Sequence, residues 1–117
     1  MNDNAKKLVE ALRSGEFKQA KGALRTGDGF CCLGVACETY RRITGVGEWE
    51  DCEGGDMRFL SDTKLLPPRV REFFGFSDHC GTFGDDDALY ELNDNGTPLD
   101  EIAALIESEP PDRKSVV

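Results

Sequence analysis

The sequence predicts a single α+β domain, with about four helices around a central cysteine-rich helix and a small antiparallel sheet or hairpin. A length of 117 residues fits one domain with a hydrophobic core. Apolar residues recur with helical spacing in several segments, and glycine-rich turns separate them from short extended runs. We expect residues 1–109 to form the domain and residues 110–117 to form a flexible tail.

The central helix is predicted over residues 30–40, the least polar stretch of a strongly charged chain. It holds three of the five cysteines. The apolar positions with helical spacing are Phe30, Leu33, Cys37 and Tyr40. A helix that is apolar on most sides must be covered by other elements, so we expect it to lie at the centre of the fold.

The remaining helices are predicted between polar or proline caps and terminal glycine or proline residues, at 5–14, 68–74 and 98–108. Residues 17–25 and 57–60 are predicted to be extended, and residues 88–92 fit either a helix or a strand. Residues 45–56 and 76–87 have the composition of acidic loops. A strong turn is expected at residues 93–96.

The formal net charge is −9, and it is unevenly distributed. Residues 1–42 carry eight Lys and Arg against five Asp and Glu, whereas residues 43–117 carry six against eighteen. Proteins that bind duplex nucleic acid present a basic surface, so we expect no such partner. The chain has no apolar run of about 20 residues and no signal-peptide pattern, which predicts a cytoplasmic protein without membrane contact.

Several motifs resemble those of small proteins from tailed phages and prophages. The signature is Phe30-Cys31-Cys32-Leu33-Gly34-Val35-x-Cys37. Shorter matches are Ala11-Leu12-Arg13-Ser14-Gly15, Phe17-Lys18-Gln19, Gly22-x-Leu24, Leu66-Pro67, Phe74-Gly75-Phe76, Leu92-Asn93-Asp94 and Ile102-Ala103. The resemblance implies a phage accessory protein that works in the bacterial cytoplasm, and such proteins often act against host defences. It implies no catalytic residue.

The leading functional hypothesis is the capture of a phosphate-bearing nucleotide signal of host immunity. Cations beside a glycine turn and a helix start are suited to bind phosphate. The predicted ligand-binding residues are Lys18, Gln19, Lys21, Arg25, Asn93 and Asp94. In this scheme the three cations hold the phosphates and the other three residues read a sugar or base, in a pocket that an oligomer interface could complete. The alternative is a set of solvated cations and an Asn-Asp turn that caps the last helix.

The second hypothesis is an acidic inhibitor of a host protein, or a DNA mimic. Its predicted interface residues are Trp49, Asp85, Asp86 and Asp87, because an aromatic anchor with an acidic rim suits a basic partner. The alternative for Trp49 is packing over a small core.

The third hypothesis is a cysteine hydrolase, with Cys31 or Cys32 as the nucleophile at a helix start. His79 is the single histidine that could act as its base. Buried thiols used for packing are the alternative. The cysteines lack the spacing of paired zinc ligands, so the sequence predicts no metal site and no cofactor.

Overall fold

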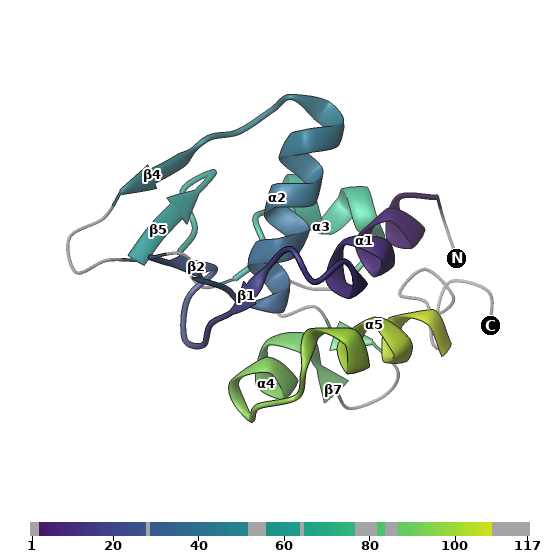
Figure 1. Ribbon diagram of the computed structural model, residues 1–117. Coiled ribbons are helices and arrows are strands. Elements are labelled where there is room, and N and C mark those ends of the chain that lie inside the picture. Colours follow the sequence, from purple (N-terminus) through teal and green to yellow (C-terminus); the bar gives the residue numbers. More distant parts are fainter. Residues whose placement is uncertain are drawn as a thin grey trace.

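The computed structural model describes residues 3–27, 29–51, 56–63, 65–76, 82–83 and 87–108. These residues form an α+β fold, which confirms the predicted class (Figure 1). The helices in the described ranges are α1 Asp3–Arg13, α2 Cys32–Thr44, α3 Pro68–Phe74, α4 Leu89–Asp94 and α5 Leu99–Ser108. In none of the described ranges is a helix long and apolar enough to span a membrane.

The main sheet is mixed, with the strand order β1-β3-β2-β5-β4. Its strands are β1 Lys18–Gln19, β2 Arg25–Thr26, β3 Gly29–Phe30, β4 Trp49–Asp51 and β5 Asp56–Phe59. Strand β1 runs parallel to β3, and the other neighbouring strands are antiparallel. A second sheet pairs β6 Thr82–Phe83 with β7 Asp87–Ala88.

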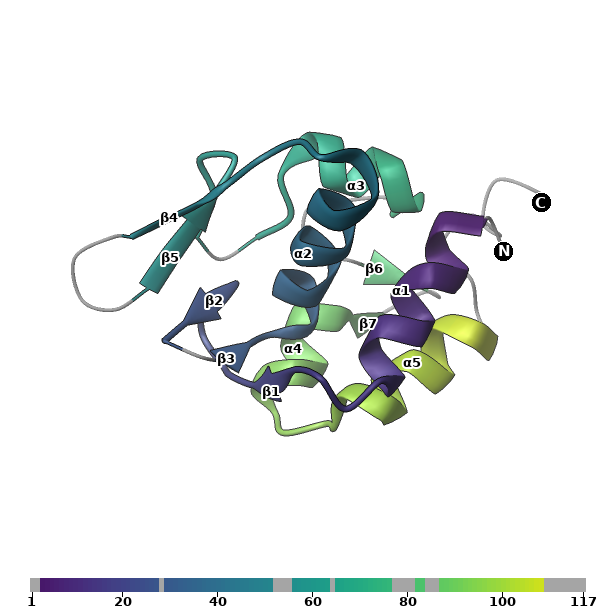
Figure 2. The same cartoon turned by 45° about the horizontal axis from the view of Figure 1, so that its top comes forward.

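Helix α2 lies at the centre, between the main sheet on one side and the other helices on the opposite side (Figure 2). Every residue from Cys32 to Tyr40 is buried. The helix begins at Cys32 rather than Phe30, because Phe30 pairs with β2 as part of β3. It ends at Gly45, whose φ of 73° provides a left-handed C-cap.

Close packing at the start of α2 explains why a glycine stands in the middle of the signature. A Cβ on Gly34 would lie 1.7 Å from the carbonyl oxygen of Leu24. Since two non-bonded heavy atoms cannot approach so closely, glycine is required where α2 passes over the chain before β2. The N–H of Cys31 donates a hydrogen bond to the same carbonyl at 3.1 Å.

Two segments differ from the prediction in a way that matters for function. Residues 45–56, predicted as a loop, contain β4, which pairs with β5 along the edge of the sheet. The strand was not predicted because it is only three residues long and two of them are acidic. Residues 76–87, also predicted as a loop, contain β6 and the first residue of β7. Residues 88–92, which fitted either state, divide between the end of β7 and the start of α4.

Candidate functional site

The side chain of Asn93 joins three elements beneath the start of α2. It is fully buried, with 0% of its surface exposed. Its Oδ1 accepts hydrogen bonds from Nε2 of Gln19 at 2.9 Å and from the N–H of Cys32 at 3.0 Å. Its Nδ2 donates to the carbonyl of Ala20 at 2.7 Å. This amide therefore connects β1, α2 and α4 from within.

Two further side chains of the predicted nucleotide site belong to the same internal network. Nε2 of Gln19 also donates to the carbonyl of Thr97 at 2.7 Å. Oδ1 of Asp94 accepts a hydrogen bond from the N–H of Gly22 at 3.0 Å. The fold does bring Gln19, Asn93 and Asp94 together, but these polar atoms already have partners in the chain. Recognition of a sugar or base by these three residues stays a prediction.

The N–H groups at the start of α2 are also engaged within the chain. Besides the bond from Cys32 to Asn93, the N–H of Gly34 donates to Sγ of Cys31 at 3.4 Å. The backbone of Leu24 covers the same turn. This helix start is therefore a packed junction, and an anion would have to displace internal partners to reach it.

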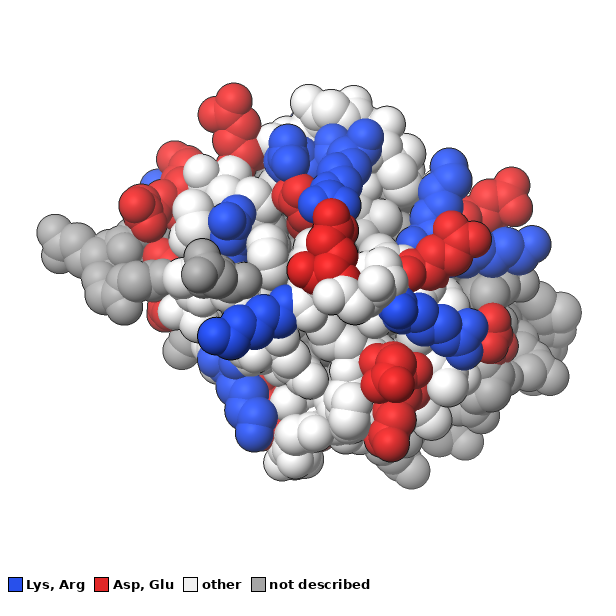
Figure 3. Space-filling model, viewed as in Figure 1, with Lys and Arg blue, Asp and Glu red and all other residues white. Residues whose placement is uncertain are grey.

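The three cations predicted to hold phosphates point in different directions. Lys18 pairs with Gly29 and Arg25 pairs with Phe30, so their side chains lie on opposite faces of the sheet. Nζ of Lys21 lies near Gly96, 3.7 Å from where a Cβ on that glycine would stand. Figure 3 shows blue Lys and Arg atoms over the region of β1 and β2. Of the three, only Arg25 lies against the rings of Phe30 and Trp49. Phosphate binding by these residues stays a prediction.

The thiols of the signature are buried. Cys31 is 4% exposed and Cys32 is 2% exposed. Burial raises the pKa of the Cys31 thiol to about 11 and the pKa of Cys32 well above its usual value. Sγ of Cys32 also donates a hydrogen bond to the carbonyl of Leu89 at 3.3 Å. Because the nucleophile is a thiolate, this geometry favours the packing alternative. His79 lies outside the described residues.

A buried carboxylate that the sequence analysis missed organises the other end of α2. Glu38 accepts hydrogen bonds from Nε and Nη2 of Arg41 at 2.8 and 2.7 Å, and from Nε of Arg42 at 2.9 Å. It also accepts one from Nε1 of Trp49 at 3.0 Å. Burial alone would raise the pKa of Glu38, but the bonds from Arg41, Trp49 and Arg42 outweigh it and lower the pKa to about 2. The spacing of the two arginines, three and four residues after Glu38, was the signal in the sequence.

Trp49 is half-buried and packs against the rings of Phe59 and Phe30, with centroids 5.0 and 5.7 Å away. This placement matches the core-packing alternative for Trp49, and its contact with a partner stays a prediction. Asp85 and Asp86 lie outside the described residues, and only the backbone of Asp87 is described, in β7.

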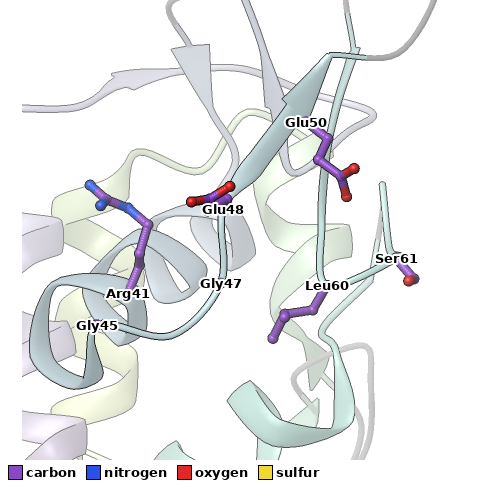
Figure 4. Close-up of a pocket in the computed structure, with 7 residues that line it drawn as sticks. All are labelled: Arg41, Gly45, Gly47, Glu48, Glu50, Leu60 and Ser61. Atoms are coloured by element: carbon purple, nitrogen blue, oxygen red, sulfur yellow. The ribbon is translucent and has the colours of Figure 1, made fainter.

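An open pocket of about 660 Å³ lies where the end of α2 meets the β4–β5 hairpin (Figure 4). Its lining residues are Arg41, Gly45, Gly47, Glu48, Glu50, Leu60 and Ser61. Arg41 and Glu48 stand at one end, and Glu50 and Ser61 stand at the other. Two of the exposed large apolar side chains, Ile43 at 38% and Val46 at 36%, lie in the same stretch of chain. We call the pocket with these two residues the hairpin face.

The turn that forms one wall of the pocket is held in an unusual conformation. Leu60 has a φ of 48° and Ser61 a φ of 76°. Phe59 and Asp62 exchange two backbone hydrogen bonds across them, at 2.8 and 3.0 Å. Residues other than glycine, asparagine and aspartate rarely adopt this left-handed conformation, which costs about 1–2 kcal/mol each. Strained residues cluster at functional sites, which makes the hairpin face a candidate binding site.

The fold and these features define a small α+β protein with a packed cysteine-rich helix and an acidic pocket at its far end. A family model described as "Domain of unknown function (DUF8296)" matches residues 1–110. The chain belongs to this family. Comparison with curated proteins and with solved structures finds no match. Among the residues that the structure describes, no group of three His, Cys, Asp or Glu side chains is placed to hold a metal ion.

Proposed function

We propose that this protein acts by binding a partner protein through the hairpin face. The observation that carries the proposal is a pocket lined by two carboxylates, Glu48 and Glu50, in the same stretch of chain as the exposed apolar side chains of Ile43 and Val46. Apolar contact with a charged rim is the usual composition of a protein interface. The edge position of β4 leaves this side of the sheet open to a partner.

The pocket suits a lysine or arginine side chain from the partner. Such a side chain places its apolar stem against a surface like that of Leu60 and keeps its charged end in a polar rim. Glu48 supplies negative charge in the rim, and Glu50 adds a carboxylate that pairs with Arg58 at 3.4 Å, while the positive charge of Arg41 is matched by Glu38. The excess of acidic residues in positions 43–117 would also attract a partner with a basic surface.

The resemblance of the Phe30–Cys37 signature to phage proteins extends this proposal. A phage accessory protein with an acidic binding face would occupy a basic groove on a host defence protein, as an inhibitor or a DNA mimic. The buried thiols of Cys31 and Cys32 support binding rather than turnover. The nucleotide hypothesis draws its structural support from Arg25.

The test is selection of a random peptide library on immobilised protein, with counter-selection against the Glu48→Gln/Glu50→Gln variant. We expect the surviving peptides to combine Lys or Arg with apolar residues and to bind more weakly as salt is added. Enrichment of no sequence, or peptides that bind the variant as tightly as the native protein, would contradict the proposal.

The matched control is the Glu10→Gln/Glu72→Gln variant, which removes the same charge from exposed positions on α1 and α3. This control variant should bind the selected peptides as tightly as the native protein does. Both pairs of substitutions leave the core untouched, and the exposed ion pair of Glu50 with Arg58, at 3.4 Å, contributes little to folding. Loss of binding in both variants would show a general charge effect and not a pocket.

A further inference from the structure

Arg25 lies in a row of aromatic and arginine side chains that contact one another on the face of the sheet toward α2. Its guanidinium carbon is 4.8 Å from the ring centroid of Phe30 and 5.5 Å from that of Trp49. Phe30 contacts Phe17 edge-on at 5.1 Å, and the guanidinium of Arg42 lies 5.4 Å from the Phe17 ring. We call these five residues the aromatic–arginine row.

The two arginines of the row differ in their polar partners. Arg42 donates to Glu16 at 2.7 Å and to Glu38 at 2.9 Å. Nε of Arg25 is buried and has no hydrogen-bond acceptor among the residues that the structure describes. Native structures pair nearly all buried donors, so the unpartnered Nε of Arg25 calls for an explanation.

The rings beneath Arg25 do not replace that acceptor. A cation above a ring is attracted to the ring face, but a ring is a much weaker hydrogen-bond acceptor than an oxygen atom. Arg25 as a whole is half-buried, so part of its side chain outside the buried Nε can be reached from solvent. The acceptors that bind a guanidinium most strongly are negatively charged oxygen atoms in its plane.

We propose that Arg25 binds the phosphate of a nucleotide whose base stacks on the exposed edge of the aromatic–arginine row. Phosphate supplies the in-plane oxygen acceptors, and bases stack on aromatic and guanidinium faces. Phe17, Phe30 and Trp49 are each half-buried and so keep part of their surface for a base. This site is distinct from the hairpin face, because Trp49 and Glu50 alternate along β4 and point to opposite sides of the sheet.

The protein contains its own probe for this site. Trp49 is the single tryptophan, and it lies 5.5 Å from the Arg25 guanidinium. The experiment is a titration of Trp49 fluorescence, with calorimetry in parallel, using ADP, a cyclic dinucleotide and inorganic pyrophosphate at low salt. We expect a saturable change with at least one of the nucleotides and weaker binding of pyrophosphate, which lacks a base.

Three variants locate the binding. Arg25→Gln should weaken nucleotide binding roughly ten- to a hundredfold, the loss expected for a hydrogen bond to a charged group. Arg69→Gln removes the same charge from an exposed position on α3 and should bind like the native protein. Arg25→Leu should also lose binding while melting within about 3 °C of the native protein or above it, since it removes a buried donor without an acceptor.

Several outcomes would overturn the inference. One is the absence of both a saturable fluorescence change and binding heat with all three compounds. Another is native-like binding by Arg25→Gln. Pyrophosphate that binds as tightly as the nucleotides would overturn the stacking of a base. Variants at Arg25 that fail to fold would show that its guanidinium is a packing element and not a ligand.

Discussion

Glu38 accepts a hydrogen bond from the indole Nε1 of Trp49 at 3.0 Å, and this bond fixes β4 to the central helix. The same carboxylate holds Arg41, which lines the pocket, and Arg42, which ends the aromatic–arginine row. Glu38 therefore sets the positions of residues in both proposed sites. We expect protonation of Glu38 to weaken the contacts that hold these residues in place.

Acid should weaken the fold through Glu38. The pKa of this carboxyl is lowered to about 2 in the folded protein, whereas an unfolded glutamate has a pKa of about 4.3. Between these values the unfolded chain binds more protons, so the stability that Glu38 contributes is present above about pH 4.3 and lost as the pH falls toward 2. Glu38→Gln should cost about 1–3 kcal/mol at pH 7 and flatten this part of the acid transition. Denaturant unfolding between pH 2 and 7 measures both effects.

The control for this prediction is Glu107→Gln, which removes an exposed carboxylate that pairs with Arg13 at 2.9 Å. An exposed pair of this kind contributes about 0–1 kcal/mol, so the variant should unfold nearly like the native protein at pH 7. If the two variants had the same stability at pH 7, Glu38 would not have the structural role described here.

Asn93→Ala should destabilise the protein by about 2–4 kcal/mol. The substitution leaves the N–H of Cys32 and the carbonyl of Ala20 without their buried partner, and each such group costs about 1–3 kcal/mol. Asn95→Ala, at an exposed position just after α4, is the control and should be neutral within about 0.5 kcal/mol. Chemical denaturation measures both. An Asn93→Ala variant as stable as the native protein would contradict the structural role of Asn93 and favour its predicted role in ligand binding.

Gly34→Ala should prevent stable folding, at a cost of about 3 kcal/mol or more. The added methyl group would overlap the carbonyl of Leu24, which is backbone and cannot rotate away. Gly22→Ala is the comparison, because Gly22 has a φ of 80° and open space around it, so only the left-handed conformation is penalised, by about 1 kcal/mol. Circular dichroism and thermal melting distinguish the two. Equal costs for the two substitutions would argue against the close approach of α2 to Leu24.

Relieving the strain in the turn at Leu60 and Ser61, which follows β5, should stabilise the protein but change the hairpin face. The double substitution Leu60→Asn/Ser61→Gly supplies the residues that favour positive φ at both positions, and it should raise the free energy of unfolding by about 1–2 kcal/mol. It also removes the Leu60 side chain from the pocket, so binding of peptides selected on the native protein should fall. Tighter peptide binding by this variant would show that Leu60 obstructs the pocket instead of forming it.

The signature thiols should react slowly in the folded protein. Cys31, Cys32 and Cys37 are buried, and burial raises the pKa of each, so little thiolate forms at neutral pH. Pulse labelling with iodoacetamide, followed by peptide mapping, should find these three modified only after denaturant is added. Rapid labelling of Cys31 or Cys32 in the native protein at pH 7 would restore the hydrolase hypothesis.

Local patterns predicted much of this fold because its helices carry strong local signals. The proline at the start of α3 and the glycine after its end were expected from the sequence, as was a helix over most of α1. The strands were harder, because strands of two to four residues contain too few positions for an alternating pattern. Strand β4 was concealed in this way within an acidic segment.

The candidate sites depended on contacts that no local pattern contains. The pairing of Gln19 with Asn93 joins residues 74 positions apart. The hairpin pocket depends on two left-handed residues, Leu60 and Ser61, whose types are uncommon in that conformation. Glu38 is different, since a lone carboxylate in an apolar helix followed by two arginines could have been recognised from its spacing alone.

Site-specific photo-crosslinking in cells that naturally produce the protein tests the proposed hairpin face most directly. A photoreactive residue in place of Val46 should form one discrete adduct with a basic protein, and the Glu48→Gln/Glu50→Gln substitutions should abolish it. The same probe in place of Ala104, exposed on α5, should not form this adduct. No adduct at position 46, or the same adduct at positions 46 and 104, would contradict binding through this face.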